Sequence, residues 1–488
     1  MSVEPLSPTK AGGLFRRKPI GDRHGPQLNR TMGTFQLMMF GVGATVGTGI
    51  FFVLSSAVPE AGPAVIVSFL LAGLAAGLAA ICYAEMASAV PVSGSTYSYA
   101  YATLGEVVAM GVAACLLLEY GVSTAAVAVG WSGYLNQLLH NLFGFQVPQQ
   151  LSAAPWDADP GFINLPAVVL IGCCALLLVR GASESAKVNA TMVVIKLAVL
   201  LMFVAVAFTG FHADNFADFA PKGVAGITAA AGTIFFTFIG LDAVSTAGDE
   251  VRDPQRTMPR GILGALAIVT SIYILVAVSA LGTQPWEAFA DPEQGEAGLA
   301  KILQDVVGAS WPGTILSAGA VVSIFSVTLV TMYGQTRILF AIGRDGLLPK
   351  AFARVNPRTH TPVNNTLIVA LVVGLRAAFI PLDYLWDLVS IGTLVAFIVV
   401  SLGVLILRRT RPDLERGFKV PGYPVTPFLA IAACLYILSG LHWYTYAWFL
   451  VWLAVVLGFY LLWGRRHSLL GRGVAEGTRD DDVDEVDA

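Results

Sequence analysis

Three ionisable side chains stand inside long apolar stretches of this 488-residue sequence, where a charge is costly. They are Glu119, Lys196 and Asp242. A charge at the centre of a bilayer costs about 2.5–3.5 kcal/mol or more, so proteins retain such residues to bind a charged ligand or to carry a proton. We therefore expect all three to act at a functional site. The alternatives are a structural hydrogen bond to a neighbouring helix and, for Lys196, a side chain that reaches an interface.

Glycines interrupt two of the apolar stretches. Four of them fall within residues 41–49, and Gly240 stands two residues before Asp242. A GxxxG packing face accounts for only two of the first four. We expect both helices to unwind here, because unwound backbone inside a membrane persists only where it is buried in protein or lines a cavity. The half-helix that begins after the break would direct its free N–H groups toward that cavity and attract an anion such as a carboxylate.

The segments that position these residues have the composition of a membrane protein. Hydrophobic residues make up 56% of the chain and charged residues 12%, against about 25% charged residues in an average soluble protein. The mean hydropathy is +0.71. Stretches of about 20 apolar residues can cross the roughly 30 Å of hydrocarbon in a bilayer. We therefore predict an all-α polytopic membrane protein with twelve transmembrane helices, at 34–58, 63–89, 105–138, 163–180, 185–210, 224–247, 261–284, 313–343, 363–381, 384–407, 424–443 and 446–464.

The distribution of basic residues tests this arrangement, because loops on the cytoplasmic side of a membrane collect Lys and Arg. If the N-terminus is cytoplasmic, the loops predicted outside contain only Lys222 and Lys301, and acidic residues gather there instead. A miscounted span would invert every later loop and destroy this pattern. We therefore expect a multi-pass protein of the cell membrane, plasma or inner, with both termini in the cytoplasm.

The two interrupted helices indicate an internal repeat. They are the first and sixth predicted spans, so they begin two sets of five, as in inverted repeats whose broken helices surround one site at the midplane. The predicted divisions are a cytoplasmic arm, a first repeat, a second repeat, two peripheral helices and a disordered acidic cytoplasmic tail. They cover residues 1–33, 34–210, 224–407, 424–464 and 465–488.

Short motifs in order along the chain resemble the amino acid–polyamine–organocation superfamily. They stand at residues 47–51, 83–86, 91–95 and 240–243. Four more resemble its cationic amino acid transporter branch, at 118–121, 334–337, 343–349 and 390–394. The resemblance runs from about residue 30 to residue 468. It implies a LeuT-type core of ten spans, in two inverted repeats of five with helices 1 and 6 broken, plus two peripheral helices. It also implies transport of an amino acid by alternating access.

The resemblance assigns the backbone at both breaks to the α-carboxylate and α-ammonium groups of the substrate. Backbone N–H groups of Gly47, Thr48 and Gly49 would hold the carboxylate, because glycine lets the backbone approach a ligand closely. Carbonyl groups would receive the ammonium, near Ala44 and from Phe236, Thr237 and Ile239. Asp242 follows directly after the second break and belongs to the same expected site.

A buried acid remains for the side chain of the substrate. Because the backbone handles the zwitterion, Glu119 is available for an ammonium or a guanidinium group, which makes lysine, arginine or ornithine the expected cargo. A small neutral amino acid such as alanine is the alternative, since a carboxyl group can also be protonated or bonded to a neighbouring helix. An amino acid exchanger and a membrane receptor that transports nothing are further alternatives.

Lys196 is the expected proton carrier. The resemblance places it against the break in the first span, where sodium-coupled relatives of this fold hold their cation. An ammonium there would hold the unwound carbonyl groups and repel Na⁺. Burial disfavours the charged form of a lysine, so its proton could leave in one conformation and return in another. We therefore expect proton-coupled symport, with a permanent structural cation as the alternative role.

Other chemistries find little support in the sequence. It has no phosphate-binding loop, no HExxH and no GxSxG, and all six histidines fall in loops or termini. We therefore expect no enzyme, and no ring-forming sequence suggests a channel. The five cysteines lack metal-ligand spacing, so we expect no metal and no cofactor. The expected partners are the amino acid, protons and the lipid bilayer, without nucleic acid. Arg376, close to Pro381, is expected to reach the outer interface.

Overall fold

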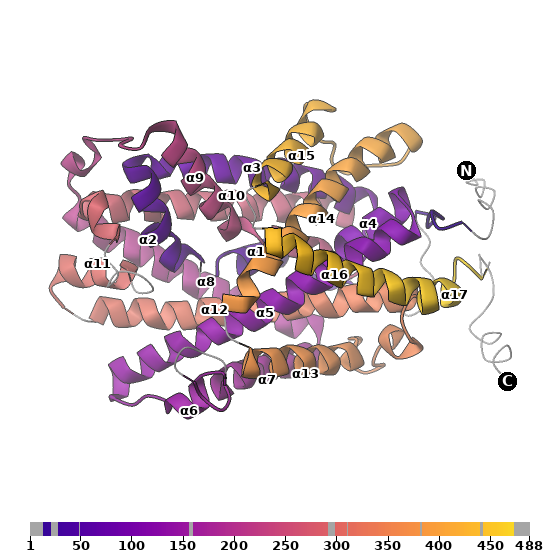
Figure 1. Ribbon diagram of the computed structural model, residues 1–488, viewed down its shortest axis with the longest axis horizontal. Helices are drawn as coiled ribbons and strands as arrows, with labels where there is room; N and C mark the ends of the chain where they lie inside the picture. The colour runs from indigo at the N-terminus through magenta and orange to yellow at the C-terminus, as the bar shows by residue number, and fades with distance from the viewer. Residues whose placement is uncertain are drawn as a thin grey trace.

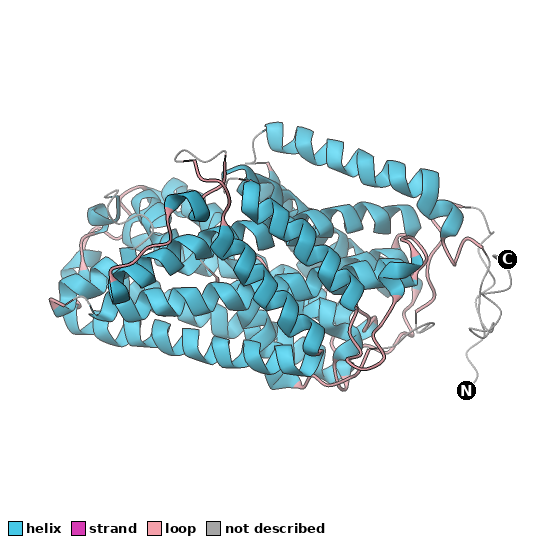
Figure 2. Ribbon diagram, turned by 90° about the horizontal axis from the view of Figure 1, so that it is seen from below, coloured by secondary structure: helices cyan, strands magenta, loops and turns pink. Residues whose placement is uncertain are grey.

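The computed structural model is a bundle of helices that run along the long axis of the molecule (Figure 1). The structure describes residues 13–20, 28–47, 49–155, 160–290, 298–309, 311–380, 383–439 and 443–472. Within these residues there are helices and loops and no strand longer than an isolated bridge (Figure 2). Eight helical segments in this part of the chain are long and apolar enough to cross a membrane, and three shorter apolar helices accompany them. The predicted all-α polytopic fold is confirmed.

The helices of the first half follow the predicted spans closely. They are α1 (Thr34–Thr45), α2 (Gly49–Ala61), α3 (Val65–Ala89), α4 (Ser95–Thr103), α5 (Glu106–Phe143), α6 (Gln149–Ser152), α7 (Leu165–Arg180) and α8 (Ala182–Ala207). The short α4 was not predicted, because its tyrosine-rich sequence is too polar for a span and carries no periodic apolar pattern.

The second half contains α9 (Gly223–Phe235), the 3-10 helix η5 (Leu241–Glu250), α10 (Pro254–Thr283), α11 (Gly298–Val307), α12 (Trp311–Arg344), α13 (Val363–Phe379), α14 (Asp383–Thr410), α15 (Val425–Leu438), α16 (Trp443–Phe459) and α17 (Arg465–His467). Helix α10 begins at Pro254, seven residues before its predicted start at 261. Proline suits the first position of a helix because its fixed φ is helical and its missing N–H would have no partner there. Arg256 and Arg260 therefore lie on the first turns of this helix and not in a loop.

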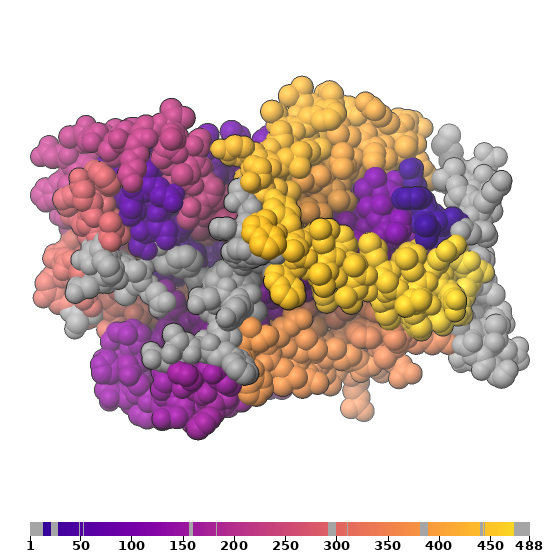
Figure 3. Space-filling view, in the orientation of Figure 1, coloured from indigo at the N-terminus to yellow at the C-terminus, as the bar shows by residue number. Residues whose placement is uncertain are grey.

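The centre of the bundle is formed by α5, which packs along α12 and α14, and by α10, which packs along α3 and α1. The most apolar part of Glu106–Phe143 is 83% buried, against 17% for Thr445–His467. The last helices accordingly lie on the outside, where α16 crosses one face of the molecule (Figure 3). A helix with so much apolar surface exposed suits contact with lipid rather than water.

The first predicted span is divided into two helices, as expected from its glycines. Helix α1 ends at Thr45 and α2 begins at Gly49, and Val46 between them has the non-helical angles φ −77° and ψ 87°. Of the residues predicted to bind substrate, Thr48 lies outside the described residues.

The sixth predicted span is interrupted too. Helix α9 ends at Phe235, Ile239 is extended, and Gly240 has a φ of +107° before η5 begins. A positive φ of this kind strains any residue with a side chain. A methyl group on Gly240 would also lie 2.8 Å from the carbonyl oxygen of Ala44. The glycine therefore allows the two breaks to touch each other.

Candidate functional site

The two helix breaks are joined by one tyrosine. The hydroxyl of Tyr273, on α10, lies 3.1 Å from the carbonyl oxygen of Thr45 and 3.1 Å from that of Thr237. Close packing adds to this link, because a methyl group on Gly49 would lie 3.0 Å from Cγ2 of Thr237. The structure thus brings the predicted backbone residues from both halves of the chain, 44–49 and 236–240, to one place inside the bundle.

Some of the backbone groups expected to bind substrate already have partners in the protein. The N–H of Gly47 donates to the carbonyl of Thr45 at 2.9 Å, and the carbonyl of Phe236 accepts from the N–H of Ile239 at 3.2 Å. A carbonyl oxygen has two lone pairs and can accept a second bond. Gly49 is the first residue of α2, and the first N–H groups of a helix have no partner inside it. Gly49 is therefore the described residue best placed to offer a free N–H to an anion.

Lys196 lies against the first break and is fully buried on α8. Its ammonium Nζ donates to the carbonyl oxygens of Gly43 at 3.0 Å and Val46 at 2.6 Å. The hydroxyl of Ser323, on α12, donates to the same Val46 oxygen at 2.9 Å. Among the residues that the structure describes, Lys196 has no carboxylate partner. Carbonyl dipoles alone therefore compensate its charge, which is the arrangement of a bound cation.

A neighbouring pair of polar residues on α8 and α12 adds hydrogen bonds to α1. The side-chain amide of Asn189 donates to the carbonyl of Met39 at 3.2 Å, and its oxygen accepts from the hydroxyl of Ser326 at 2.8 Å. Asn189 and Ser326 therefore join α1, α8 and α12, and Asn189 stands seven residues before Lys196 on α8. The sequence offered no signal for this pair, because single Asn and Ser residues are common in membrane helices.

Two buried carboxyl groups belong to helices that meet at Tyr120. Glu119, on α5, directly precedes this tyrosine, and Asp242, in η5, is bonded to it. Oδ2 of Asp242 accepts a hydrogen bond from the hydroxyl of Tyr120 at 2.6 Å. Oδ1 of Asp242 and Oε2 of Glu119 have no hydrogen-bond partner, and no described Lys or Arg pairs with either group. Buried polar atoms without partners indicate a missing ligand, a proton or water.

Tyr120 is a residue of the site that the sequence did not single out as functional. It lies within the motif at 118–121, so its position was visible although its role was not. The tyrosine fits against α12 because residue 334 is glycine: a methyl group there would lie 2.4 Å from Cε1 of Tyr120. Gly334 therefore sets how closely the tyrosine and Asp242 can approach α12.

The expectation for Arg376 is wrong. A methyl group on Gly121 would lie 3.2 Å from Nη1 of Arg376 and 2.9 Å from Nε2 of Gln335, so the guanidinium points into the bundle and not to the outer interface. The side chains of a helix tilt toward its N-terminus. Arg376 stands near the C-terminal end of α13, so this tilt turns it back toward the interior, where Gly121 leaves room.

Comparisons of the sequence with known proteins find relatives over most of its length. The sequence profile of a family described as "Amino acid permease" matches residues 32–460. The chain is 42% identical over 468 residues to the branched-chain amino acid permease BcaP of Bacillus subtilis (strain 168), covering 94% of this chain and 100% of that protein. It is 41% identical over 464 residues to the methylthioribose transporter of the same organism, covering 94% and 99%. It is 36% identical over 411 residues to "Cationic amino acid transporter 2, vacuolar" of Arabidopsis thaliana, covering 82% and 64%.

Proposed function

The chain belongs to the amino acid permease family, and from this premise we propose that it is a secondary active transporter that carries an amino acid together with protons. The relatives are permeases and transporters, so the protein is a transport protein and not an enzyme. The observation that carries the coupling proposal is the pair of hydrogen bonds from the Lys196 ammonium to the carbonyls of Gly43 and Val46. An amino acid exchanger with the same site is the alternative. A receptor that transports nothing is disfavoured, because the relatives are named as permeases and transporters.

The coupling proposal follows from the chemistry of a buried lysine. While protonated, Lys196 holds the unwound carbonyls and keeps the broken helix in shape for the substrate. Once deprotonated, the neutral amine has two hydrogens and no charge, so it holds these carbonyls less strongly and the site can empty. Loss of the proton is favoured when the surroundings are apolar, because burial disfavours the charged form. The positive charge also disfavours Na⁺ at this position.

The carboxyl pair supports a cationic substrate. Glu119 and Asp242 each offer an oxygen without a partner, and no described cation neutralises them. The backbone at the breaks would bind the zwitterion common to all amino acids. Thr48 and Gly49 would hold the carboxylate, joined by Gly47 once its N–H leaves the carbonyl of Thr45, and carbonyls of Ala44, Phe236, Thr237 and Ile239 would receive the ammonium. Glu119, with Asp242 beside it, would then bind the ammonium or guanidinium of lysine, ornithine or arginine.

A neutral amino acid is the second candidate, and the relatives are the observation that favours it. BcaP, with 42% identity over the whole of its length, is named for branched-chain amino acids. In that case the carboxyl pair would share a proton, because two buried like charges cannot both ionise cheaply. The methylthioribose transporter has similar identity, so a neutral thioether sugar belongs in the same test.

The helices support the predicted architecture of twelve spans. Taking α1 with α2, and α9 with η5, as broken spans, the others would be α3, α5, α7, α8, α10, α12, α13, α14, α15 and α16. We assign the end of the bundle that carries Arg16, Arg344 and Arg408 to the cytoplasm of the cell membrane, since basic residues concentrate there. Helices α15 and α16 would be the peripheral pair outside two inverted repeats of five.

Uptake into proteoliposomes tests the proposal. The purified protein would be offered labelled arginine, lysine, alanine, leucine and methylthioribose, with a pH gradient, with a Na⁺ gradient and with neither. We expect saturable accumulation of one amino acid class above equilibrium only with the pH gradient. Accumulation driven only by Na⁺ would refute the coupling proposal. Strict one-for-one exchange would favour the exchanger, and binding without flux would favour the receptor.

A further inference from the structure

A surface groove lies beside the first turns of α10, away from the substrate site. It has a volume of about 460 Å³ and is lined by Gln255, Arg256, Pro259, Arg260, Leu263, Gly264, Gly417 and Phe418. The first six positions lie on one face of α10, because they follow the spacing of a helix. The last two belong to the loop between α14 and α15. A cavity of this size is within the range of small-molecule sites.

Five arginines at this end of the bundle pair closely with carboxylates, and the two arginines of this groove do not. Arg16, Arg337, Arg344, Arg408 and Arg416 each pair with a carboxylate within 3.3 Å. By contrast, no ion pair is found for Arg260 among the described residues, and Arg256 lies 3.9 Å from Asp253, with both side chains largely exposed. An exposed pair at that distance contributes little. The two guanidinium groups are therefore available to a ligand.

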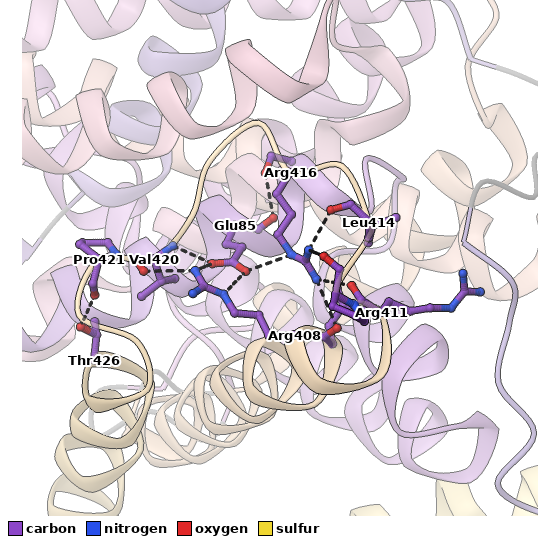
Figure 4. A network of polar contacts seen from close by, with 11 residues as sticks. Glu85, Arg408, Arg411, Leu414, Arg416, Val420, Pro421 and Thr426 are labelled. Carbon is purple, nitrogen blue, oxygen red and sulfur yellow. Dashed lines mark hydrogen bonds and ion pairs between the residues drawn. The ribbon is translucent and has the colours of Figure 1, made fainter. Parts of the chain in front are cut away.

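The loop wall of the groove is held rigidly in place. Glu85, on α3, accepts two hydrogen bonds from Arg408, at 2.8 and 2.5 Å, pairs with Arg416 at 3.3 Å, and accepts from the N–H of Val420 at 2.6 Å (Figure 4). Residues 417 and 418 lie between these anchored positions. The wall is therefore formed before any ligand arrives, which lowers the entropic cost of binding.

Gly417 brings this wall close to α10. A methyl group on Gly417 would lie 1.9 Å from the carbonyl oxygen of Gln255. No residue with a side chain fits at this distance without moving the loop or the helix. The width of the groove thus depends on one glycine.

The polarity of the groove changes along the helix axis. Its polar residues, Gln255, Arg256 and Arg260, come first, and Leu263 and Gly264 lie deeper along α10. This helix has 30 residues, or about 45 Å at 1.5 Å per residue, whereas the hydrocarbon of a bilayer is about 30 Å thick. About ten residues therefore extend beyond the hydrocarbon. If the C-terminal end of α10 reaches the opposite boundary of the hydrocarbon, residues 254–263 lie at the level of the lipid headgroups. The part of the groove that lies further along α10 then contacts the acyl chains.

We propose that this groove is a binding site for an anionic glycerophospholipid, whose phosphate lies between Arg256 and Arg260 and whose glycerol and upper acyl chain lie against Leu263, Gly264 and Phe418. Guanidinium groups bind phosphate through paired hydrogen bonds. A soluble anion would use only the arginines and leave the apolar part of the groove empty. A zwitterionic lipid would bring its own cation toward them. The site does not depend on which substrate is transported.

Lipid binding can be measured directly by native mass spectrometry of the full-length protein. The protein would be titrated with phosphatidylglycerol, and separately with phosphatidylcholine and inorganic phosphate. In the Arg256→Gln/Arg260→Gln variant we expect the affinity for phosphatidylglycerol to fall about 25-fold, from about fivefold for each arginine near a membrane surface. Gly417→Ala, which leaves the charge unchanged and shifts the wall, should lower the same affinity.

A matched control is available at this end of the bundle. Arg354 and Arg358 are also exposed arginines four residues apart, and they do not line the groove. Their double replacement by glutamine should leave phosphatidylglycerol binding unchanged. Equal losses in both double variants would show only nonspecific charge attraction and overturn the proposal. Wild-type affinity in the Arg256→Gln/Arg260→Gln variant would overturn it as well. So would equal binding of phosphatidylcholine, or full displacement of the lipid by millimolar inorganic phosphate.

Discussion

Replacing Lys196 by alanine removes the ammonium from the first helix break. Its two hydrogen bonds, to the carbonyls of Gly43 at 3.0 Å and Val46 at 2.6 Å, are lost. Bonds that involve a charged group contribute about 1.5–3 kcal/mol each, so the break loses about 3–6 kcal/mol of gross stabilisation. Val46 keeps the hydroxyl of Ser323 as a donor at 2.9 Å. The variant should nevertheless fold, because it also avoids the several kcal/mol that burial of an ammonium costs.

The expected effect is on energy coupling. With one proton per amino acid, a gradient of two pH units can drive about 100-fold accumulation, because each unit is worth about 1.36 kcal/mol, or a factor of ten. Wild-type proteoliposomes should approach this limit. The Lys196→Ala variant should bring the substrate only to equal concentrations on both sides, whatever the pH gradient. Lys187→Ala is the matched control, since Lys187 is an exposed lysine on the same helix α8.

Two results would refute the reasoning. The first is uphill, pH-driven accumulation in Lys196→Ala vesicles, which would leave Lys196 as a structural cation. The second is strict dependence of wild-type uptake on Na⁺. A melting temperature close to that of the wild type is required before either variant is interpreted, because a misfolded protein would also fail to accumulate substrate.

The other predictions concern the break, the acid and a buried ion pair. Gly49→Val places a Cβ atom 3.0 Å from Cγ2 of Thr237 and adds two methyl groups, so substrate binding measured by calorimetry should be abolished in a folded protein; normal binding would place the site elsewhere. Glu119→Gln removes a buried charge, and competition by arginine should weaken about tenfold or more, while competition by alanine stays the same. Unchanged arginine competition would remove Glu119 from the recognition of the side chain. Arg337→Met breaks a fully buried pair with Glu250, joined by contacts of 2.9 and 3.1 Å. We expect a loss of about 3–5 kcal/mol in unfolding free energy, seen as a large fall in melting temperature, and a small fall would show that the pair is already solvated.

The sequence alone predicted the features that depend on local composition. Long apolar runs form helices because a bilayer leaves the backbone no other partner than itself. The glycines at 41–49 and Gly240 marked the two breaks, since only their conformational freedom and lack of a side chain allow the chain to bend there. Glu119, Lys196 and Asp242 were conspicuous because charges are rare in such surroundings. Motifs in order then identified the family.

The tertiary structure decided which groups meet. Tyr273 bridges Thr45 and Thr237, which belong to different halves of the chain. The inward direction of Arg376 depends on space left by Gly121 on another helix. Partners of this kind are set by helix packing, where a glycine on one helix fixes how closely a side chain of the next can approach. The residue types and spacing within one segment do not determine that distance. The sequence therefore predicted the charged residues of the candidate site, while the fold determined their contacts.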